Sequence, residues 1–459
     1  MPAADPAQPD PEAIMRGRRF VALLVLVAIV GVVASLAAFG FLTLLHDSQG
    51  WVFDDLPEAL GFDSAPTWWP VPVLAIAGVV VAGAIVLLPG RGGHVPAHGL
   101  NPEPTQPIEL PGVLLAALAT IGLGLVLGPE APLIALGGGL GYLAIRVLRR
   151  DAPPQLSDLV AASGTFAAVS FLFGSPVIAA VLLVEATGIG GQRLRLVLVP
   201  GLLAAGIGSL VSTGIGSWAG VDTSEISLEA LSLPAFPRPD LVDFLWTVPL
   251  AAAVAAATFA ILTLARSAER VVAPRPFVAL PVAGVAVAGL AIAFSEITGK
   301  GIDQVLFSGE EQVGPLVADA GAWSLSALAL LIACKGLAYA ISLASFRGGP
   351  VFPALFLGAA GGLMAAQLPG FETTPAVAVC LGAAVVAVLG LPLSSVVLAT
   401  LLTFESGLGV GPLIIVGVVV AHLTTLALSG SREPVPTQDG GADAGEAPAP
   451  STPGSAPSG

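Results

Sequence analysis

Long apolar runs separated by short polar stretches fill this chain between residues 20 and 430. The first covers residues 20 to about 45 and the second about 70–88. A helix needs about 20 apolar residues to cross about 30 Å of hydrocarbon, so both runs are predicted to span a membrane. Further apolar segments cover about 110–127, 132–148, 157–173, 176–188, 194–215, 241–266, 274–295, 323–343, 351–367, 373–390, 392–405 and 411–429.

Several of these runs are too short to cross a bilayer, and Gly and Pro interrupt them. Short, broken helices are tolerated at membrane depth only where they are buried in protein or line a cavity. The pattern therefore predicts an all-α polytopic membrane protein in which some helices are tilted and do not span.

The polar stretches divide the chain into five parts. Arg16, Arg18 and Arg19 precede the first span, which puts the N-terminus in the cytoplasm by the positive-inside rule and predicts a multi-pass protein of the cell membrane. The predicted parts are a disordered tail (1–15), a first membrane repeat (16–215), an extramembrane linker (216–240), a second membrane repeat (241–430) and a disordered tail (431–459).

Composition strengthens the membrane prediction and excludes other classes. The chain is 55% hydrophobic and 10% charged, whereas soluble domains carry about 25% charged residues. The 17 Lys and Arg are too few and too scattered for a nucleic-acid partner. Cys334 and Cys380 lie in apolar segments without metal-ligand spacing, so no metal or cofactor is expected. Membrane lipid is an expected partner of the apolar surface.

A single carboxylate, Glu130, lies within about forty otherwise apolar and Gly-rich residues. An isolated charge is costly in hydrocarbon, so such a residue usually faces a polar path or a partner. Pro129 and Pro132 predict that a helix begins there, and a helix N-terminus attracts anions. Glu130 could therefore be a built-in anion in a site made for a mobile one, or a plain helix cap.

An internal repeat supports the first interpretation. Residues 128–137 align with residues 349–358: both prolines, both bounding glycines and one leucine coincide, and Gly141 pairs with Gly362. About forty residues after each block, Ser175-Pro176 and Leu391-Pro392 open further short helices. Duplicated broken helices point to a binding site where two repeats meet, although chance similarity between Gly/Pro/Leu-rich helices is the alternative.

At these residues the chain resembles the CLC family of chloride channels and proton–chloride exchangers, over about 20–430. Residues 128–132 resemble the family's Gly-Arg/Lys-Glu-Gly-Pro block, residues 92–96 its Gly-Ser-Gly-Ile-Pro block, and residues 348–353 its Gly-Gly-x-Phe-x-Pro block. The resemblance implies an inverted repeat, a homodimer without regulatory domains, and a mid-membrane anion site at helix N-termini near 92–96, 129–132 and 349–353. The residues that it assigns to anion binding are Gly93, His94, Gly128, Pro129, Ala131, Gly349, Val351 and Phe352, with Glu130 as the gating glutamate.

Some positions depart from the family pattern. Gly93 stands where the family usually has an anion-coordinating serine, and the family's central tyrosine has no counterpart near the C-terminus. Pro350 lacks an N–H, so either one backbone donor is missing or the aromatic has moved to Phe352 and the register differs. These departures predict a wider or more weakly coordinated ion site.

The resemblance also bears on proton coupling, because family exchangers carry an inner proton-relaying glutamate. Counting from Pro176 puts Ala186 at that position, and Glu185 matches a neighbouring family glutamate with a more structural role. Alanine cannot carry a proton, so passive permeation is favoured. A shift of one residue would make Glu185 the inner proton residue.

Three further residues or pairs have a functional and a structural interpretation. Arg347 could attract an entering anion or pair with Glu130, or it could be satisfied by backbone carbonyls. Lys335 could aid an intracellular vestibule, as the resemblance implies, or extend to the membrane interface. His94 and His98 have a four-residue spacing that suits a metal only on a helix, which the nearby glycines disfavour.

The sequence therefore predicts passive, channel-like transport of chloride or a similar small anion, gated by Glu130. A proton-coupled anion exchanger is the closest alternative, and a scaffold that no longer conducts is another. An enzyme is disfavoured because no HExxH, GxSxG or CxxC motif and no paired intramembrane aspartates occur.

Overall fold

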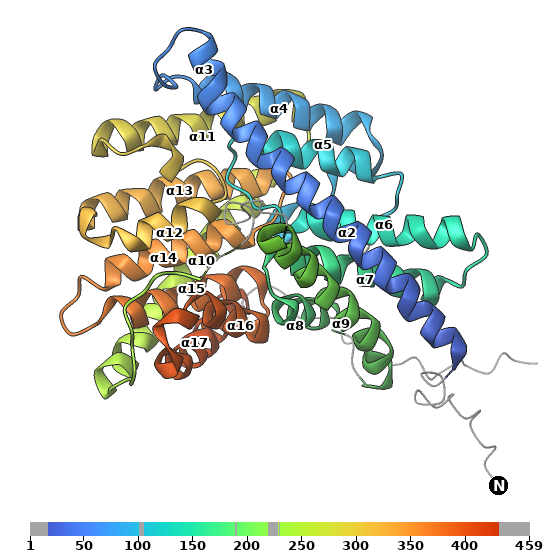
Figure 1. Cartoon of the computed structure of the whole chain (residues 1–459). Helices are drawn as coiled ribbons and strands as arrows, with labels where there is room; N and C mark the ends of the chain where they lie inside the picture. The colour runs from blue at the N-terminus through green and yellow to red at the C-terminus, as the bar shows by residue number, and fades with distance from the viewer. Residues whose placement is uncertain (1–16, 101–104, 189–190, 219–227, 229, 431–459) are drawn as a thin grey trace, which may run out of the picture.

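A computed structural model describes residues 17–100, 105–188, 191–218, 228 and 230–430, and the two predicted disordered tails lie outside these ranges. The described residues form helices joined by short loops (Figure 1). The first half contains α2 (Arg18–Gly50), α3 (Leu56–Ala59), α4 (Pro70–Leu87), α5 (Leu110–Ile121), α6 (Glu130–Leu148), α7 (Pro154–Leu172), α8 (Pro176–Thr187) and α9 (Gly191–Thr213).

The second half repeats this order. It contains α10 (Leu241–Val272), α11 (Pro276–Thr298), α12 (Glu310–Ala318), α13 (Leu325–Ser345), α14 (Val351–Ala365), α15 (Thr373–Leu389), α16 (Pro392–Leu402) and α17 (Gly411–Ser429). Helix α6 packs on α7 as α14 packs on α15, and α8 meets α16 across the two halves. The all-α fold of duplicated, partly non-spanning helices predicted from the sequence is confirmed.

The aligned glycines of the two blocks serve the same packing purpose. A Cβ on Gly137 or Gly141 would lie 2.4 or 2.6 Å from the backbone of α7, and one on Gly358 or Gly362 would lie 2.7 or 2.4 Å from the backbone of α15. Real Cβ atoms do not come so close, so each short helix approaches its neighbour only because glycine lacks a side chain. The repeat is therefore visible in packing as well as in sequence.

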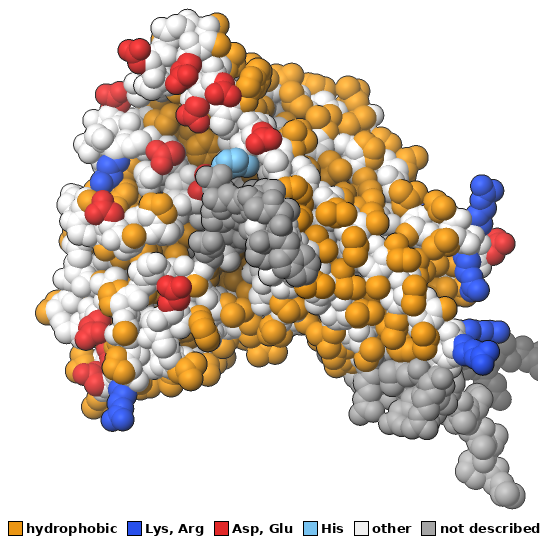
Figure 2. Space-filling view, in the orientation of Figure 1, with side chains coloured by type: hydrophobic (Ala, Val, Ile, Leu, Met, Phe, Trp, Pro, Cys, Tyr) orange, Lys and Arg blue, Asp and Glu red, His pale blue; other side chains and the backbone are white. Residues whose placement is uncertain are grey.

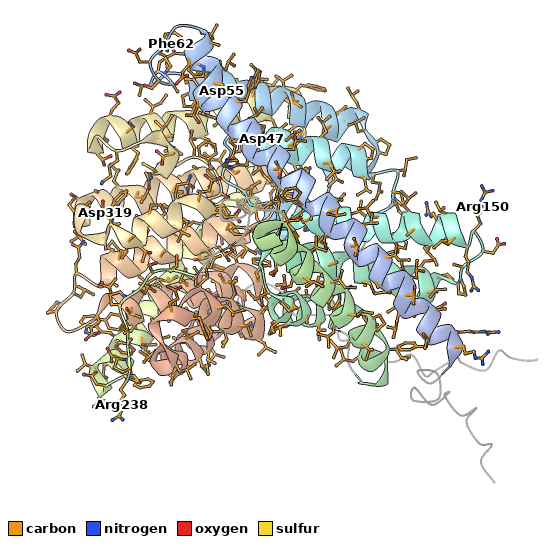
Figure 3. The ribbon with its side chains drawn as sticks, viewed as in Figure 1. Asp47, Asp55, Phe62, Arg150, Arg238 and Asp319 are labelled. Atoms are coloured by element: carbon orange, nitrogen blue, oxygen red, sulfur yellow. The ribbon has the colours of Figure 1, made fainter. Side chains whose placement is uncertain are left out.

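Nine helical stretches among the described residues are long and apolar enough to cross a membrane, and α5, α8, α14, α15 and α16 are shorter apolar helices. Apolar side chains cover most of the face in Figure 2, as expected for a surface in contact with lipid. Acidic side chains gather near α3, where Asp47 and Asp55 are exposed, whereas Arg150 marks the far end of α6 (Figure 3).

Three local expectations differ from the structure. Helix α2 continues through a π-turn (Trp51–Asp55) into α3, so part of the polar segment between the first two predicted spans is helical. Helix α12 lies in a polar stretch, 303–319, where no helix was expected. Residues 92–96 do not start an α-helix: the chain forms the 3-10 turns Pro89–Gly92 and Pro96–His98, because four consecutive residues, 90–93, adopt positive φ.

Candidate functional site

The two repeated blocks meet at one point in the structure. The Gly128 N–H donates to the Gly349 carbonyl at 2.8 Å, and the Gly349 N–H donates to the Gly128 carbonyl at 2.6 Å. This antiparallel bridge joins the residues just before α6 to those just before α14, so the N-termini of both short helices converge there. Unpaired N–H groups and the positive ends of two helix dipoles are thus directed at one place.

Glu130 occupies this place. It is the first residue of α6, as Pro129 and Pro132 predicted, and its side chain is fully buried. Its Oε1 accepts a hydrogen bond from the Val351 N–H, which is the first N–H of α14. The carboxylate of one repeat therefore caps the helix of the other repeat, in the position of an anion bound at a helix N-terminus.

Two glycines make room for the Glu130 carboxylate. A Cβ on Gly349 would lie 1.9 Å from the Glu130 Cδ, and a Cβ on Gly128 would lie 2.1 Å from its Oε2. Either added atom would overlap the side chain, so both positions need glycine for Glu130 to keep this conformation. Oε2 itself has no hydrogen-bond partner among the described residues.

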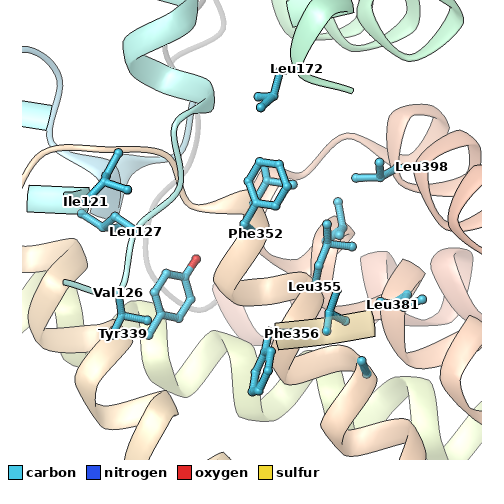
Figure 4. Packing of buried hydrophobic residues seen from close by; sticks show 14 of the residues in the cluster. Ile121, Val126, Leu127, Leu172, Tyr339, Phe352, Leu355, Phe356, Leu381 and Leu398 are labelled. Carbon is cyan, nitrogen blue, oxygen red and sulfur yellow. The ribbon is translucent and has the colours of Figure 1, made fainter. Parts of the chain in front are cut away.

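The register of the second block follows from the same contacts. The bridge pairs Gly128 with Gly349, Pro350 supplies no N–H, and Val351 is the donor to Glu130. Pro350 instead offers its carbonyl, which accepts a hydrogen bond from the Tyr339 hydroxyl at 2.6 Å. Figure 4 shows Tyr339 on α13 and Phe352 on α14, among the buried side chains of this region.

A cavity of about 230 Å³, here called the Arg347 cavity, lies beside one flank of Glu130. Ala131, the residue after Glu130, lines it, as do the predicted Gly93 and His94. The loop after α4 forms part of its wall, and this loop returns to the side of the molecule where α2 begins. Its lining is Gly90, Gly92, Gly93, His94, Thr105, Glu109, Val113, Ala117, Ala131, Pro132, Ile134, Ala135, Arg347 and Gly348.

Arg347 is the cation of this cavity, with 9% of its surface exposed. Burial lowers the pKa of its guanidinium to about 10, opposed by the negative charge of Glu269, and the group therefore stays charged at neutral pH. Its Nη1 donates to the Phe346 carbonyl at 3.1 Å, and it forms no ion pair with Glu130. Of its expected roles, pairing with Glu130 was therefore wrong, and carbonyl contact accounts for one of its donors.

A smaller cavity of about 40 Å³, here called the Glu310 cavity, lies on the other flank. Pro129, the residue before Glu130, lines it together with Glu310, Glu311 and His46. The last part of α2 forms one wall, so this cavity lies toward the opposite side of the molecule. Burial, together with the charges of Glu130 and Glu311, raises the pKa of Glu310 well above its usual range.

Lys335 does not extend to a membrane interface, so that interpretation was wrong. It is fully buried on α13, and its Nζ donates to the Gln304 and Leu306 carbonyls at 3.1 and 2.9 Å. The ammonium also lies 4.3 Å from the centre of the Phe356 ring, and Lys335 does not line the Arg347 cavity. These contacts hold the loop that leads into α12 and its Glu310.

Glu185 lies at the end of α8 and caps α16. Its carboxylate accepts the N–H groups of Leu393 and Ser394 at 2.9 and 2.7 Å and the Ser394 hydroxyl at 2.6 Å. The contact ties the two halves together at a second place. Glu185 therefore has a structural task whether or not it also carries a proton.

The structure gathers the predicted residues into two groups. Glu130 meets Gly128, Gly349 and Val351 directly, whereas Gly93, His94, Ala131 and Arg347 line the neighbouring cavity. Sequence reasoning missed Tyr339 and Glu310. Within the described residues, no three His, Cys, Asp or Glu side chains gather as a metal site, and His98 pairs with Glu269 at 2.9 Å.

Comparisons with known proteins agree with this geometry. The model of a family described as voltage gated chloride channel matches residues 93–426. A putative ion-transport protein YfeO from Salmonella paratyphi A is 31% identical over 363 residues, which cover 76% of this chain and 81% of that protein. The YfeO protein of Salmonella schwarzengrund is 32% identical, with the same coverage.

Solved structures share the fold at low sequence identity. A slow cyanobacterial Cl⁻/H⁺ antiporter superposes with a TM-score of 0.73 at 18% identity, covering 89% of this chain and 95% of that one. A CLC-type fluoride/proton antiporter superposes with a TM-score of 0.64 at 16% identity, covering 88% and 95%. At these identities the likeness concerns the arrangement of helices.

Proposed function

Because this chain belongs to the voltage-gated chloride channel (CLC) family, we propose that it lets small anions pass through a pathway that the Glu130 side chain gates. Transport of anions across a membrane is the activity of that family. The finer proposal is that permeation is passive, with chloride or a similar anion as the permeant ion.

One observation carries the proposal. Three consecutive residues separate two cavities: Pro129 lines the Glu310 cavity, Ala131 lines the Arg347 cavity, and Glu130 between them is fully buried and lines neither. A carboxylate in that place blocks the connection between the two cavities. Its hydrogen-bond donor, the Val351 N–H, is one that an anion could use instead.

The gating step follows from charge. An ionised Glu130 is attracted to the N-termini of α6 and α14 and competes with an incoming anion for the same donors. Protonation removes its charge and with it most of this attraction, so the side chain can leave and an anion can take its place. Anion flux should therefore rise as the pH falls.

The ion site itself is sparsely coordinated. Pro350 supplies no N–H, Gly93 supplies no hydroxyl and lines the Arg347 cavity, and the Tyr339 hydroxyl is engaged by the Pro350 carbonyl. Few donors give weak binding, and weak binding permits rapid release. This supports a conducting pathway for several small anions more than a tight chloride site.

A proton-coupled exchanger is the alternative, and the antiporters with the same fold favour it. In that mechanism Glu185 would be the inner proton residue. Its carboxylate already accepts three hydrogen bonds at the start of α16, and releasing it would leave those donors unpaired. This supports the passive mechanism.

The proposed setting is a homodimer in the cell membrane with the N-terminus in the cytoplasm. Exposed Arg18 and Arg19 at the start of α2, and Arg149 and Arg150 at the end of α6, lie on the side that the positive-inside rule assigns to the cytoplasm. The Arg347 cavity then faces inward and the Glu310 cavity faces outward.

Chloride efflux from proteoliposomes tests the mechanism. Efflux is recorded with and without a potassium ionophore while the external pH is followed, for the wild type, Glu130→Gln and, as a control, Glu405→Gln on an exposed turn. Efflux that needs the ionophore and leaves the pH unchanged indicates passive conduction. Glu130→Gln should then conduct at every pH, and Glu405→Gln should behave as the wild type.

Two results would contradict the proposal. Proton uptake that follows chloride loss and disappears in Glu130→Gln would identify an exchanger. Absence of flux for every halide, in a protein that is folded by thermal melting, would mean that the pathway no longer conducts.

A further inference from the structure

The Arg347 side chain is only partly satisfied by the protein around it. Nη1 donates to the Phe346 carbonyl at 3.1 Å, whereas Nε is buried without a hydrogen-bond partner, and no acceptor for Nη2 is found among the described residues. Buried donors are normally paired, and an unpaired one calls for an explanation such as a bound ion. Nε and Nη2 form one edge of the planar guanidinium.

The surrounding chain holds the Arg347 side chain at the wall of the cavity. Arg347 lines the 230 Å³ cavity and is nine-tenths buried. Gly92, at φ +71°, lies against its stem: a Cβ there would come 3.4 Å from the Arg347 Cγ and 3.0 Å from the Ala116 Cβ. The backbone N–H of Arg347 donates to the Thr120 hydroxyl at 3.3 Å, which ties the Arg347 backbone to α5.

We propose that the Nε–Nη2 edge of Arg347 coordinates an anion in this cavity and selects planar oxyanions, such as nitrate, over chloride. The inference rests on the proposed anion transport and names the substrate class of the same pathway. Two parallel N–H groups match two oxygens of a planar oxyanion, whereas a spherical halide cannot make the same bidentate contact.

The other charges near the guanidinium are compatible with a transient anion. His94 and Glu109 line the cavity, and the Glu109 carboxylate accepts the Gln106 N–H at 3.0 Å. Glu269 lowers the positive potential at Arg347 but is itself paired with His98. One cation opposed by nearby carboxylates binds an anion weakly enough for it to leave, as a transport pathway requires.

The Arg347 site also fits the missing side-chain donor of the first half. Gly93 and Arg347 line the same cavity, and Gly93 supplies no hydroxyl at the position where the resemblance implies a serine. A guanidinium supplies more donors than one hydroxyl and in a fixed plane. The cavity thus keeps a coordinating group but changes the anion shape that it prefers.

Binding measured by calorimetry in detergent tests the site without requiring flux. Nitrate and chloride are titrated into the wild type, Arg347→Lys, Arg347→Gln and the control Arg91→Gln. Arg91 is an exposed positive residue of the loop after α4 and does not line the cavity. We expect the wild type to bind nitrate about tenfold more tightly than chloride. Arg347→Lys, which keeps the charge but not the fork, should lose this preference while chloride binding changes less than about threefold.

The outcomes separate this inference from the proposed function. Equal binding of the two anions by the wild type, or an unchanged nitrate preference in Arg347→Lys, would overturn the oxyanion site even if chloride flux is normal. Nitrate binding that depends on Arg347 in a protein that shows no flux would support the site and overturn conduction. If Arg347→Gln fails to fold, Arg347→Lys still decides, because its positive charge is kept.

Discussion

The two cavities beside Glu130 differ in size and in charge. The Arg347 cavity has about 230 Å³ and one buried cation, whereas the Glu310 cavity has about 40 Å³, two adjacent glutamates and His46. The larger one suits a waiting anion, and the smaller one repels anions and attracts protons. Under the proposed gating, the difference predicts that an anion and a proton reach Glu130 from opposite sides.

The largest effect is expected from a substitution that displaces the Glu130 side chain from its place between the two cavities. Gly349→Ala would place a Cβ 1.9 Å from the Glu130 Cδ, and the flexible side chain should move rather than the backbone. We expect anion flux at pH 7.5 to rise at least about tenfold and to lose most of its pH dependence, as when an attraction of about 1.4 kcal/mol is lost.

Gly137→Ala is the matched control for that substitution. Its Cβ would lie 2.4 Å from the Gly164 carbonyl of α7, so it should disturb helix packing and not the gate. It should lower the melting temperature while the pH profile of flux is kept. If both substitutions change the pH profile equally, the gate is not controlled by the contact with Gly349.

Glu310→Gln tests whether the acidic Glu310 cavity influences the gate. Burial and the charges of Glu130 and Glu311 raise the pKa of Glu310, so Glu310 keeps its proton to higher pH than an exposed glutamate and repels Glu130 only once it ionises. Because glutamine resembles the protonated acid, the pH midpoint of flux in the variant should fall by less than about one unit, the shift that a permanently charged neighbour would produce. Glu311→Gln, which removes a charge paired with His46 at 3.1 Å, should shift it less.

Glu310→Gln should also change how stability depends on pH. Because burial and neighbouring charges raise the pKa of Glu310 in the folded protein, the folded state holds this proton more tightly than the unfolded chain does. Stability is therefore lost as the pH rises from about 4, the unfolded pKa, through the raised folded pKa. Thermal melting should show that the advantage of the Gln variant is small at pH 4 and larger at pH 8.

A smaller effect is expected from Tyr339→Phe, which removes the hydroxyl that holds the second block at Pro350. The substitution leaves the buried Pro350 carbonyl without its donor and should lower the free energy of unfolding by about 1 kcal/mol. Flux should change less than with Gly349→Ala, since Glu130 keeps its contact with Val351. An unchanged melting temperature would show that the hydroxyl does not stabilise the second block.

The smallest effect on flux is expected from Glu185→Gln. The side chain lies at the end of α8 and not in either cavity, and glutamine keeps one acceptor for the N–H groups of α16. Flux and its pH profile should stay within about twofold of the wild type, as for surface changes outside a site. A selective loss of proton-linked transport would assign Glu185 to an exchange mechanism.

The sequence predicted those parts of the site that depend on local rules. Prolines fix where α6 begins, and the repeated glycines predict two equivalent short helices. It could not predict Glu310, because α12 lies in a polar stretch and Glu310 becomes partly buried only when α12 packs on α14. Tyr339 was missed for a similar reason: its hydroxyl reaches Pro350 eleven residues away, where helix periodicity gives no information.

The error at residues 92–96 has another physical origin. The Gly/Pro-rich residues 92–96 resemble the sequences that start α6 and α14. However, four consecutive residues with positive φ, 90–93, cannot continue into an α-helix. Only the three-dimensional fold shows that this loop instead places Gly92 against the stem of Arg347.

The bridge between Gly128 and Gly349 has a consequence for speed. Its two hydrogen bonds join one repeat to the other beside Glu130, so a rocking motion of the two halves would have to break them. The proposed gate needs the movement of a single side chain and not a movement of whole domains, which takes microseconds to milliseconds. If Glu130 gates transport as proposed, turnover should not be limited by movements of the two halves.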